Sequence, residues 1–453
     1  MMSDKTGGLE LVTGSVSKTF LKWVLPNIAA FIAMFSFNFV DLFFIGKYAG
    51  YADTLYITAA STNPIYVFIN CVAVMLSAGG AVITGKYLGE NDYDKASAVF
   101  TRVVTVIAVS SLILSALCLS FGKEITGLFG GLNDEILTEE TGYSDIVSLF
   151  FIFQTMSYAL YVFVRLDGNP YLAAFAAILG TAVNFICDYH FIVNADMGIK
   201  GAAWGTGVSY MVCAGLLTLH FIFKKGDLRF VKKNNGWKEI FAAAYNGSSE
   251  CLGSLSIGIT AAAFSFVTVH HIGVQGAAAF AAINYAIWIA NMLCFAAANS
   301  LTLIAAVNYG AKKFERIKKF TMLSCDCVFI ISFLMFLAFS LFPEKIIGLF
   351  ISGNDNAFAI ALNFAFYIRY AFFFIGLNIA ASALFTGVRK PFQSLLISLL
   401  RGLILPVVFI MIAPVFAGNI GLYTAVPLAE IITFLCACVL FMKSDVMNKI
   451  IKS

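Results

Sequence analysis

The sequence predicts an all-α polytopic membrane protein with twelve transmembrane helices in two six-helix bundles related by pseudo-two-fold symmetry. Of the 453 residues, 60% are hydrophobic and only 12% are charged. A soluble chain has too little interior to bury that much apolar surface. Apolar stretches of about twenty residues also recur from end to end, as membrane-spanning helices require. A third observation, an internal repeat, divides the helices into two bundles.

The helices follow from the apolar runs, because roughly 20 residues are needed to cross ~30 Å of hydrocarbon. Backbone groups in lipid must be paired internally, and the alternating pattern of barrel strands is absent, so each run is expected to be a helix. The predicted spans are 20–43, 55–83, 97–121, 143–164, 171–193, 199–223, 240–269, 277–307, 320–342, 357–386, 392–416 and 421–442.

The basic residues predict the orientation of these helices. Lys and Arg number 29, and 23 of them lie in or beside the N-terminus, the even-numbered loops and the C-terminus. The odd-numbered loops hold only four, Lys47, Lys123, Lys200 and Lys345. Because positively charged loops stay on the cytosolic side, both termini are expected in the cytosol, with the chain as a multi-pass protein of the cell membrane. The net charge of +4 is then a topology signal, and no nucleic-acid partner is expected.

Neither the N-terminus nor the cysteines indicate processing or a redox function. The first 18 residues, MMSDKTGGLELVTGSVSK, are polar, so no cleaved signal peptide is expected. The ten Cys are scattered mostly within helices without ligand spacing, which favours packing roles. No cofactor other than a transported ion is expected, and no nucleophile–base set or phosphate loop indicates an enzyme.

The chain repeats itself at a shift of 220 or 221 residues. FGKEITGLF at 121–129 matches FPEKIIGLF at 342–350, and GENDYDK at 89–95 matches GAKKFER at 310–316. The glycines at 198 and 201 return at 418 and 421. This repeat predicts an N-terminal bundle over 1–230 and a C-terminal bundle over 231–453. Two such bundles are typical of transporters that bind substrate between their halves.

Polar side chains from three predicted helices reach one depth in the N-terminal bundle. At 1.5 Å per residue, Asp188 lies ~26 Å from the cytosolic start of its helix, and Thr206 lies ~12 Å below the outer surface. Asp41, near the end of the first helix, reaches a similar height. Asn184 and Asp188, four residues apart, share a helix face. Their oxygens suit Na⁺ or a proton, because both prefer hard oxygen ligands. The alternative is that Asp188 is a capped or paired structural group.

Two further acids, Glu250 and Glu430, lie inside predicted helices of the C-terminal bundle. A membrane-buried carboxylate marks a functional site by default, although either Glu could simply hydrogen-bond across helices. Arg369 and Arg401, the two basic residues within helices of this bundle, are candidate partners. Pro26 in the first helix removes a backbone hydrogen bond and is expected to bend that helix.

Six stretches together resemble the multidrug and toxic compound extrusion (MATE) family of antiporters. They cover nearly the whole chain in order: LPNIAAFIAMFSFNFVDLFFIGKYAG (25–50), GKYLGENDYDKA (85–96), VRLDGNP (164–170), NFICD (184–188), GAAWGT (201–206) and VNYGAKKFERIKK (307–319). The resemblance implies a cation site formed by Asp41, Asn184, Asp188 and Thr206, which would be a metal site if the coupling ion is Na⁺. It also implies bending at Pro26 that follows the charge of this site. Glu250 lies earlier on its helix than the acid of some branches of the family.

The resulting expectation is a secondary active antiporter that exports organic cations or amphipathic drugs in exchange for Na⁺ or H⁺. Its expected partners are a small-molecule substrate and membrane lipid, and a monomer is expected. One alternative is a flippase for a lipid-linked precursor, which would need a strongly cationic central cavity. Another is a membrane receptor or scaffold without transport, which would have little use for four ion ligands at one depth.

Overall fold

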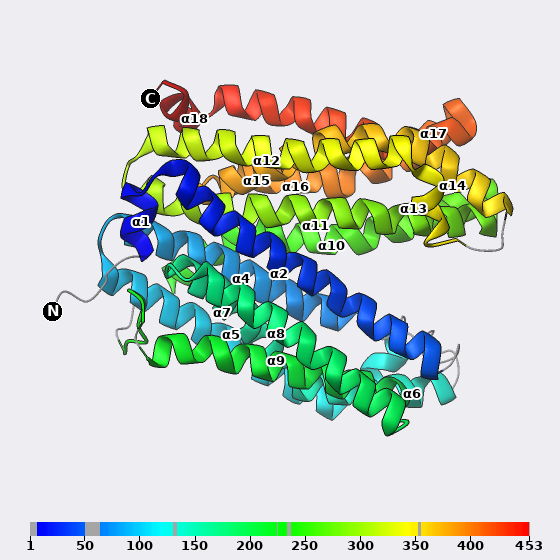
Figure 1. Cartoon of the computed structure of the whole chain (residues 1–453), viewed down its shortest axis with the longest axis horizontal. Coiled ribbons are helices and arrows are strands. Elements are labelled where there is room, and N and C mark those ends of the chain that lie inside the picture. Colours follow the sequence, from blue (N-terminus) through cyan, green and yellow to red (C-terminus); the bar gives the residue numbers. More distant parts are fainter. Residues whose placement is uncertain are drawn as a thin grey trace. The chain divides into compact units, whose positions relative to one another are not determined.

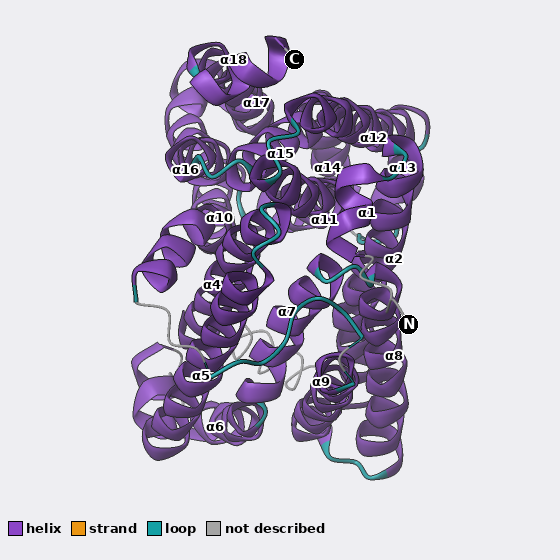
Figure 2. Cartoon of the chain, turned by 90° about the vertical axis from the view of Figure 1, so that its left-hand side faces the viewer, coloured by secondary structure: helices purple, strands orange, loops and turns teal. Residues whose placement is uncertain are grey.

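The computed structural model describes residues 7–49, 64–129, 134–223, 225–232, 237–351 and 355–452. Within these ranges the regular structure is helical throughout, and no strand is present (Figure 2). The predicted all-α class is confirmed. By their contacts the residues form two compact units, Met1–Gly14 with Leu21–Gly247, and Ser15–Phe20 with Ser248–Ser453. The domain boundary at 230/231 stays a prediction.

The first unit begins with a short helix and continues through long apolar ones (Figure 1). Its elements are α1 (Gly7–Thr13), α2 (Val16–Phe44), η1 (Ile45–Ala49), α4 (Pro64–Gly89), α5 (Tyr93–Phe129), α6 (Asp134–Leu149), α7 (Phe151–Leu166), α8 (Pro170–Asp188), η2 (Tyr189–Asn194) and α9 (Gly198–Ile222). Both η1 and η2 are π-helical turns. Within this unit α4 packs on α5 and α7, and α9 packs on α7 and α8.

The helix α10 (Lys238–Ile272) passes from the first unit into the second, since the boundary falls at Gly247. The elements that follow are α11 (Val274–Gly310), α12 (Phe314–Leu341), α13 (Pro343–Gly348), α14 (Asp355–Ile368), η3 (Arg369–Ala371), α15 (Phe372–Gly387), α16 (Pro391–Leu399), η4 (Leu400–Ile404), α17 (Leu405–Lys443) and α18 (Asp445–Lys452). In the second unit α11 packs on α12 and α15, as α4 does on α5 and α7.

The described helices account for twelve crossings. Ten are long and apolar enough to span a membrane, and a pair bent by 50°, Thr141–Leu149 with Phe151–Leu166, makes an eleventh. The last of the ten, Pro391–Lys443, has 53 residues, or ~80 Å of helix, far more than one crossing needs. Residues 55–63 of the predicted second span lie outside the described residues. Three short helices, α1, α13 and α18, lie outside the predicted spans.

The long final segment turns back on itself at Gly418, which supplies the twelfth crossing. Gly418 has φ 55° and ψ −136°, a conformation open in practice only to glycine. A Cβ on Gly421 would meet the backbone of Ala413 and Pro414, which would lie ~12 Å away along a straight helix. Figure 1 shows the reversal beside the label of α17.

The internal repeat is visible in the backbone itself. Left-handed residues recur at the repeat shift, as the pairs Asn91 and Lys312, Gly168 and Arg389, and Gly198 and Gly418. Non-helical breaks at Phe121 and Phe342 also have nearly the same φ and ψ. Since these positions are set by turn geometry rather than by composition, the two six-helix units are repeats of one structure.

The Gly418 reversal yields a test of this fold. Gly418→Ala forces an L side chain into a glycine conformation, which costs about 1–3 kcal/mol. The variant should melt at a lower temperature than the wild type in detergent. Gly348→Ala is the matched control, because its Cβ meets nothing within 4 Å and its φ is not left-handed. Equal melting temperatures for both variants would contradict the reversal.

Candidate functional site

Four polar side chains from α2, α8 and α9 meet inside the first unit. The Asn184 amide Nδ2 donates to Asp41 Oδ1 at 3.0 Å and to Asp188 Oδ1 at 3.4 Å. The Thr206 hydroxyl donates to Asp41 Oδ2 at 3.3 Å. The depth arithmetic thus identified residues that are neighbours in the folded chain, and Asn184 bridges the two carboxylates.

Two buried oxygens of this cluster have no hydrogen-bond partner among the described residues. They are Asn184 Oδ1 and Asp188 Oδ2. Asn184 and Asp188 are fully buried, with 0% of each exposed. Neither carboxylate forms an ion pair with a Lys or Arg of the described chain. Two adjacent buried carboxylates without a counter-charge are costly in a low-dielectric interior, so the arrangement favours a bound cation or a shared proton.

Small residues on α9 make room for this cluster. A Cβ on Gly205 would overlap with Asp188 Oδ1. Gly201 lies against Phe191, where a Cβ would stand 3.1 Å from the Phe191 backbone. Because the glycines of GAAWGT have no side chains, α9 approaches α8 closely enough for Thr206 to share the site. Gly201 and Gly205 therefore allow the close packing that brings the site residues together.

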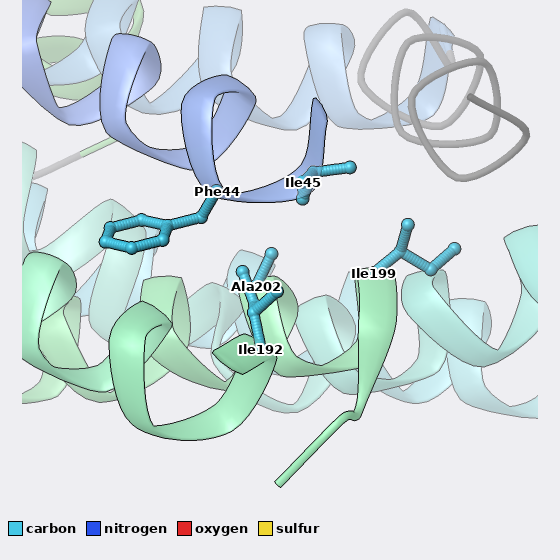
Figure 3. Packing of buried hydrophobic residues seen from close by; sticks show 5 residues of the cluster. All are labelled: Phe44, Ile45, Ile192, Ile199 and Ala202. Carbon is cyan, nitrogen blue, oxygen red and sulfur yellow. The ribbon is translucent and has the colours of Figure 1, made fainter. Parts of the chain in front are cut away.

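An apolar cluster packs together from the ends of the helices that carry the polar site (Figure 3). Its members are Phe44, Ile45, Ile192, Ile199 and Ala202, all at most 3% exposed. Phe44 and Ile45 follow Asp41 by three and four residues, Ile192 follows Asp188 by four, and Ala202 precedes Thr206 by four. Residues at this spacing share a helix face, so this cluster, here called the apolar plug, covers the polar site along the helix axes.

The helices change geometry where the site meets the apolar plug. α2 passes into the π-helical turn η1 after Phe44, and α8 passes into η2 directly after Asp188. In η2 the backbone N–H of Ala195 bonds to His190 O, five residues back. Such π turns are frequent at functional sites because they re-aim side chains within a helix.

The second unit contains an acid that is already neutralised. Glu430 Oε1 accepts hydrogen bonds from Arg401 Nη2 at 3.1 Å and Nε at 3.3 Å, and Oε2 accepts one from Asn378 Nδ2 at 2.7 Å. Arg401 Nη2 also donates to Asn291 Oδ1 at 2.7 Å. Arg401 was one of two candidate partners, and the structure pairs it with Glu430.

Glu250 differs from Glu430 because its carboxylate has no ion pair or hydrogen bond to any described residue. The one hydrogen bond at this residue goes to its backbone, where Ser254 Oγ donates to Glu250 O at 2.9 Å. The other candidate cation, Arg369, stacks instead on Phe366, with its guanidinium carbon 4.3 Å from the ring centroid. Glu250 and Glu430 therefore differ in whether a described residue neutralises or binds the carboxylate.

Pro26 is buried within α2, which runs through it without ending. Its ring leaves the carbonyl of Lys22 without the usual helical partner. Asp41 is 15 residues further along the chain, or ~22 Å along the helix. Any influence of the site on Pro26 therefore has to pass along α2.

The structure reveals a buried contact between Asp167 and His220 that the sequence did not predict. Asp167 is 4% exposed and His220 is 3% exposed. Asp167 Oδ2 lies 2.8 Å from His220 Nε2, and Oδ1 accepts the backbone N–H groups of Asp227 and Leu228, both at 2.8 Å. The chain after α9 is thus tied to the end of α7. No sequence signal marks this contact, because the partners are 53 to 61 residues apart.

Among the described residues, no group of three or more His, Cys, Asp and Glu side chains is placed to hold a metal ion. The site of α2, α8 and α9 has only two carboxylates, which is consistent with a monovalent ion or a proton and not with a transition metal.

Membrane-spanning helices in two repeated units, with a buried carboxylate pair in one of them, are typical of a membrane transporter. The MatE family model matches residues 26–190 and 252–412, well over half of the chain. The chain belongs to the MatE family, in which transport is coupled to an ion.

Known proteins are similar over almost the full length. The multidrug export protein MepA of Staphylococcus aureus (strain MSSA476) is 23% identical over 436 residues, which cover 93% of this chain and 92% of MepA. A crystal structure of MATE in complex with MaL6 matches with a TM-score of 0.90 and 17% identity, over 99% of this chain and 100% of that one. An aspartate-to-asparagine mutant of the Vibrio cholerae MATE transporter VcmN matches with a TM-score of 0.88 and 18% identity, over 96% and 99%. At these identities the structures show the fold alone.

Proposed function

We propose that the chain exports organic cations or amphipathic drugs in exchange for inward movement of Na⁺ or H⁺. The observation that carries this proposal is the buried pair of carboxylates that Asn184 bridges and that has no counter-charge among the described residues. The family match and the similarity to a multidrug export protein support the substrate class.

The coupling ion would bind at Asp41, Asn184, Asp188 and Thr206. For Na⁺, the ligands would be the two carboxylates, the free Asn184 Oδ1 and the Thr206 hydroxyl oxygen, all hard oxygen donors. For H⁺, one proton shared by Asp41 and Asp188 would remove their mutual repulsion. Imposing sodium and proton gradients separately on proteoliposomes distinguishes the two ions.

Coupling requires that the ion bind one conformation more tightly than the other, because equal affinity shifts no equilibrium. The apolar plug could control when the ion reaches the site. An ion approaching along the helix axes would have to pass the side chains of Phe44, Ile45 and Ile192, so the site would exchange ions only when the ends of α2 and α8 separate. We propose bending of α2 at Pro26 as the motion that follows.

The alternative functions make different demands. A flippase would place unpaired cations within the membrane, yet Arg401 is paired with Glu430 and Arg369 stacks on aromatic rings. A receptor or scaffold would show no ion-driven flux in proteoliposomes. We propose that both termini are cytosolic and that one chain suffices for transport. Light scattering of the purified protein tests the monomer.

Asp188→Asn tests the coupling site. The exchange keeps the size of the side chain and removes its charge, so the variant should fold but lose the dominant attraction for a cation. We expect gradient-driven export in proteoliposomes to fall at least tenfold, which corresponds to about 1.4 kcal/mol or more of lost ion binding. Asp326→Asn, at an exposed acid of α12, is the control and should transport normally. Normal transport by well-expressed Asp188→Asn would rule out the proposed site.

Glu250→Gln tests the recognition of substrate charge. Because the Glu250 carboxylate has no partner among the described residues, a cationic substrate would lose its counter-charge in the variant. Binding of organic cations should weaken about tenfold, and binding of neutral substrates should change little. Glu344→Gln, at an exposed acid of α13, is the matched control. Equal losses for cationic and neutral substrates would return Glu250 to a structural role.

The topology proposal can be tested with single cysteines in a variant that lacks the native ones. The distribution of basic residues places residue 232 in the cytosol and residue 195 outside. In intact cells, an impermeant maleimide should label Ala195→Cys and leave Lys232→Cys unlabelled until the cells are opened. The reverse pattern would overturn the proposed orientation.

A further inference from the structure

The second unit contains a cavity of about 370 Å³ between α12, α15 and α17, apart from the residues discussed above. Its lining includes Thr321 and Cys325 of α12, Ala381 of α15, and Phe434, Cys438 and Met442 of α17. Thr321 and Cys325 lie in the first turns of α12, and Met442 lies at the end of α17. The cavity therefore lies toward the end of the unit at which α12 begins and α17 ends.

This cavity offers a ligand almost no polar group. The Thr321 hydroxyl donates to Ile317 O at 2.8 Å, so it is used within its own helix. Cys325 and Cys438 are free thiols, which pack as small apolar groups. A volume of this size falls within the ~300–1,000 Å³ range of small-molecule sites, and the lining suits a hydrocarbon chain.

The end of the unit beside the cavity is basic. Lys318 precedes Thr321 by one helical turn, and Lys443 directly follows Met442. The short helix α18 packs on both α12 and α17, and Lys318 Nζ donates to Ile451 O at 2.8 Å. Lys449 and Lys452 of α18 are exposed.

The helix α18 is amphipathic and packs its apolar side on the unit. It buries Met447 and Ile450 against the unit and presents its lysines to the surroundings. Asp445, in its first turn, is the only acid in its sequence, DVMNKIIK. Basic residues beside gaps between transmembrane helices attract the headgroups of anionic lipids.

We propose that this cavity binds an acyl chain of an anionic phospholipid, with the headgroup phosphate held by Lys318, Lys443 and the lysines of α18. The chain would fill the space between α12, α15 and α17, and the headgroup would join α18 to the ends of α12 and α17. The same lysines repel organic cations, so the lipid site is distinct from the substrate site. The inference depends on the membrane location of the chain and not on ion coupling.

The two cysteines in the cavity provide the readout. Full-length protein, purified in detergent and delipidated, is treated with N-ethylmaleimide in the presence of phosphatidylglycerol or phosphatidylcholine. The alkylation rates of Cys325 and Cys438 are then followed by peptide mass spectrometry. Phosphatidylglycerol should slow alkylation of both at least threefold, phosphatidylcholine should not, and the rate at Cys187 of α8 should stay unchanged as the internal reference.

Variants separate the headgroup from the acyl chain. The double variant Lys318→Gln/Lys443→Gln should lose the protection, and Lys318→Arg/Lys443→Arg should keep it. Lys95→Gln, at an exposed lysine of the first unit, is the control and should behave as the wild type. Ala381→Leu, which fills the cavity, should reduce the phosphatidylglycerol retained in native mass spectra even though its lysines are intact.

Several outcomes would overturn the proposal. Equal protection by both lipids would indicate an unspecific lipid shell, and protection that survives the Lys→Gln changes would exclude a headgroup site. Protection that appears without lipid as the protein concentration rises would identify a second copy of the chain as the occupant instead.

Discussion

Hydrocarbon cannot solvate a charge, and this constraint organises the polar groups of the whole chain. Every carboxylate placed within the membrane must be neutralised by the protein or by something that the protein binds. Two acidic clusters, one in each unit, meet this requirement in different ways. In the second unit Glu430 is held by Arg401 and Asn378, so its charge is compensated permanently. In the first unit the Asn184 amide donates to both Asp41 and Asp188, and the Thr206 hydroxyl donates to Asp41 alone. Neither carboxylate has an ion-pair partner among the described residues.

The contrast is informative because the two units are repeats. They share left-handed turns and helix breaks at a shift of 220 or 221 residues. Some tertiary contacts recur as well: Ser157 Oγ donates to Tyr210 O in one unit, and Asn378 Nδ2 donates to Glu430 O in the other. The chemistry does not recur, since the positions that match Asp188 are Val408 and Phe409. One architecture therefore holds a carboxylate pair without a described counter-charge in one copy and the Arg401–Glu430 ion pair in the other.

The residues around Asp41 and Asp188 indicate which helices a conformational change would involve. The apolar plug packs together from the ends of the helices that carry the polar groups, so a shift of any of these helices changes both together. At the other side of the unit, Asp167 and His220 tie the chain that follows α9 to the end of α7. Breaking these hydrogen bonds would leave buried polar groups without partners, which is costly. The first unit is thus held by hydrogen bonds where the connecting chain leaves it. On the side of the polar site, α2 and α8 instead pass into π turns.

The sequence alone determined much of this protein. The lengths of the apolar runs predicted the helices, and the internal repeat predicted their division into two bundles. The depths of four polar residues predicted that they could meet, namely Asp41, Asn184, Asp188 and Thr206. These inferences succeed because span length and helical periodicity are local properties of the chain. The tertiary structure alone decided that Arg401 neutralises Glu430, that Glu250 has no described partner, that Asp167 is buried on His220, and that Gly205 leaves room for the Asp188 carboxylate. Each of these depends on which side chains from distant segments come within hydrogen-bond distance, and local patterns carry no information about that distance.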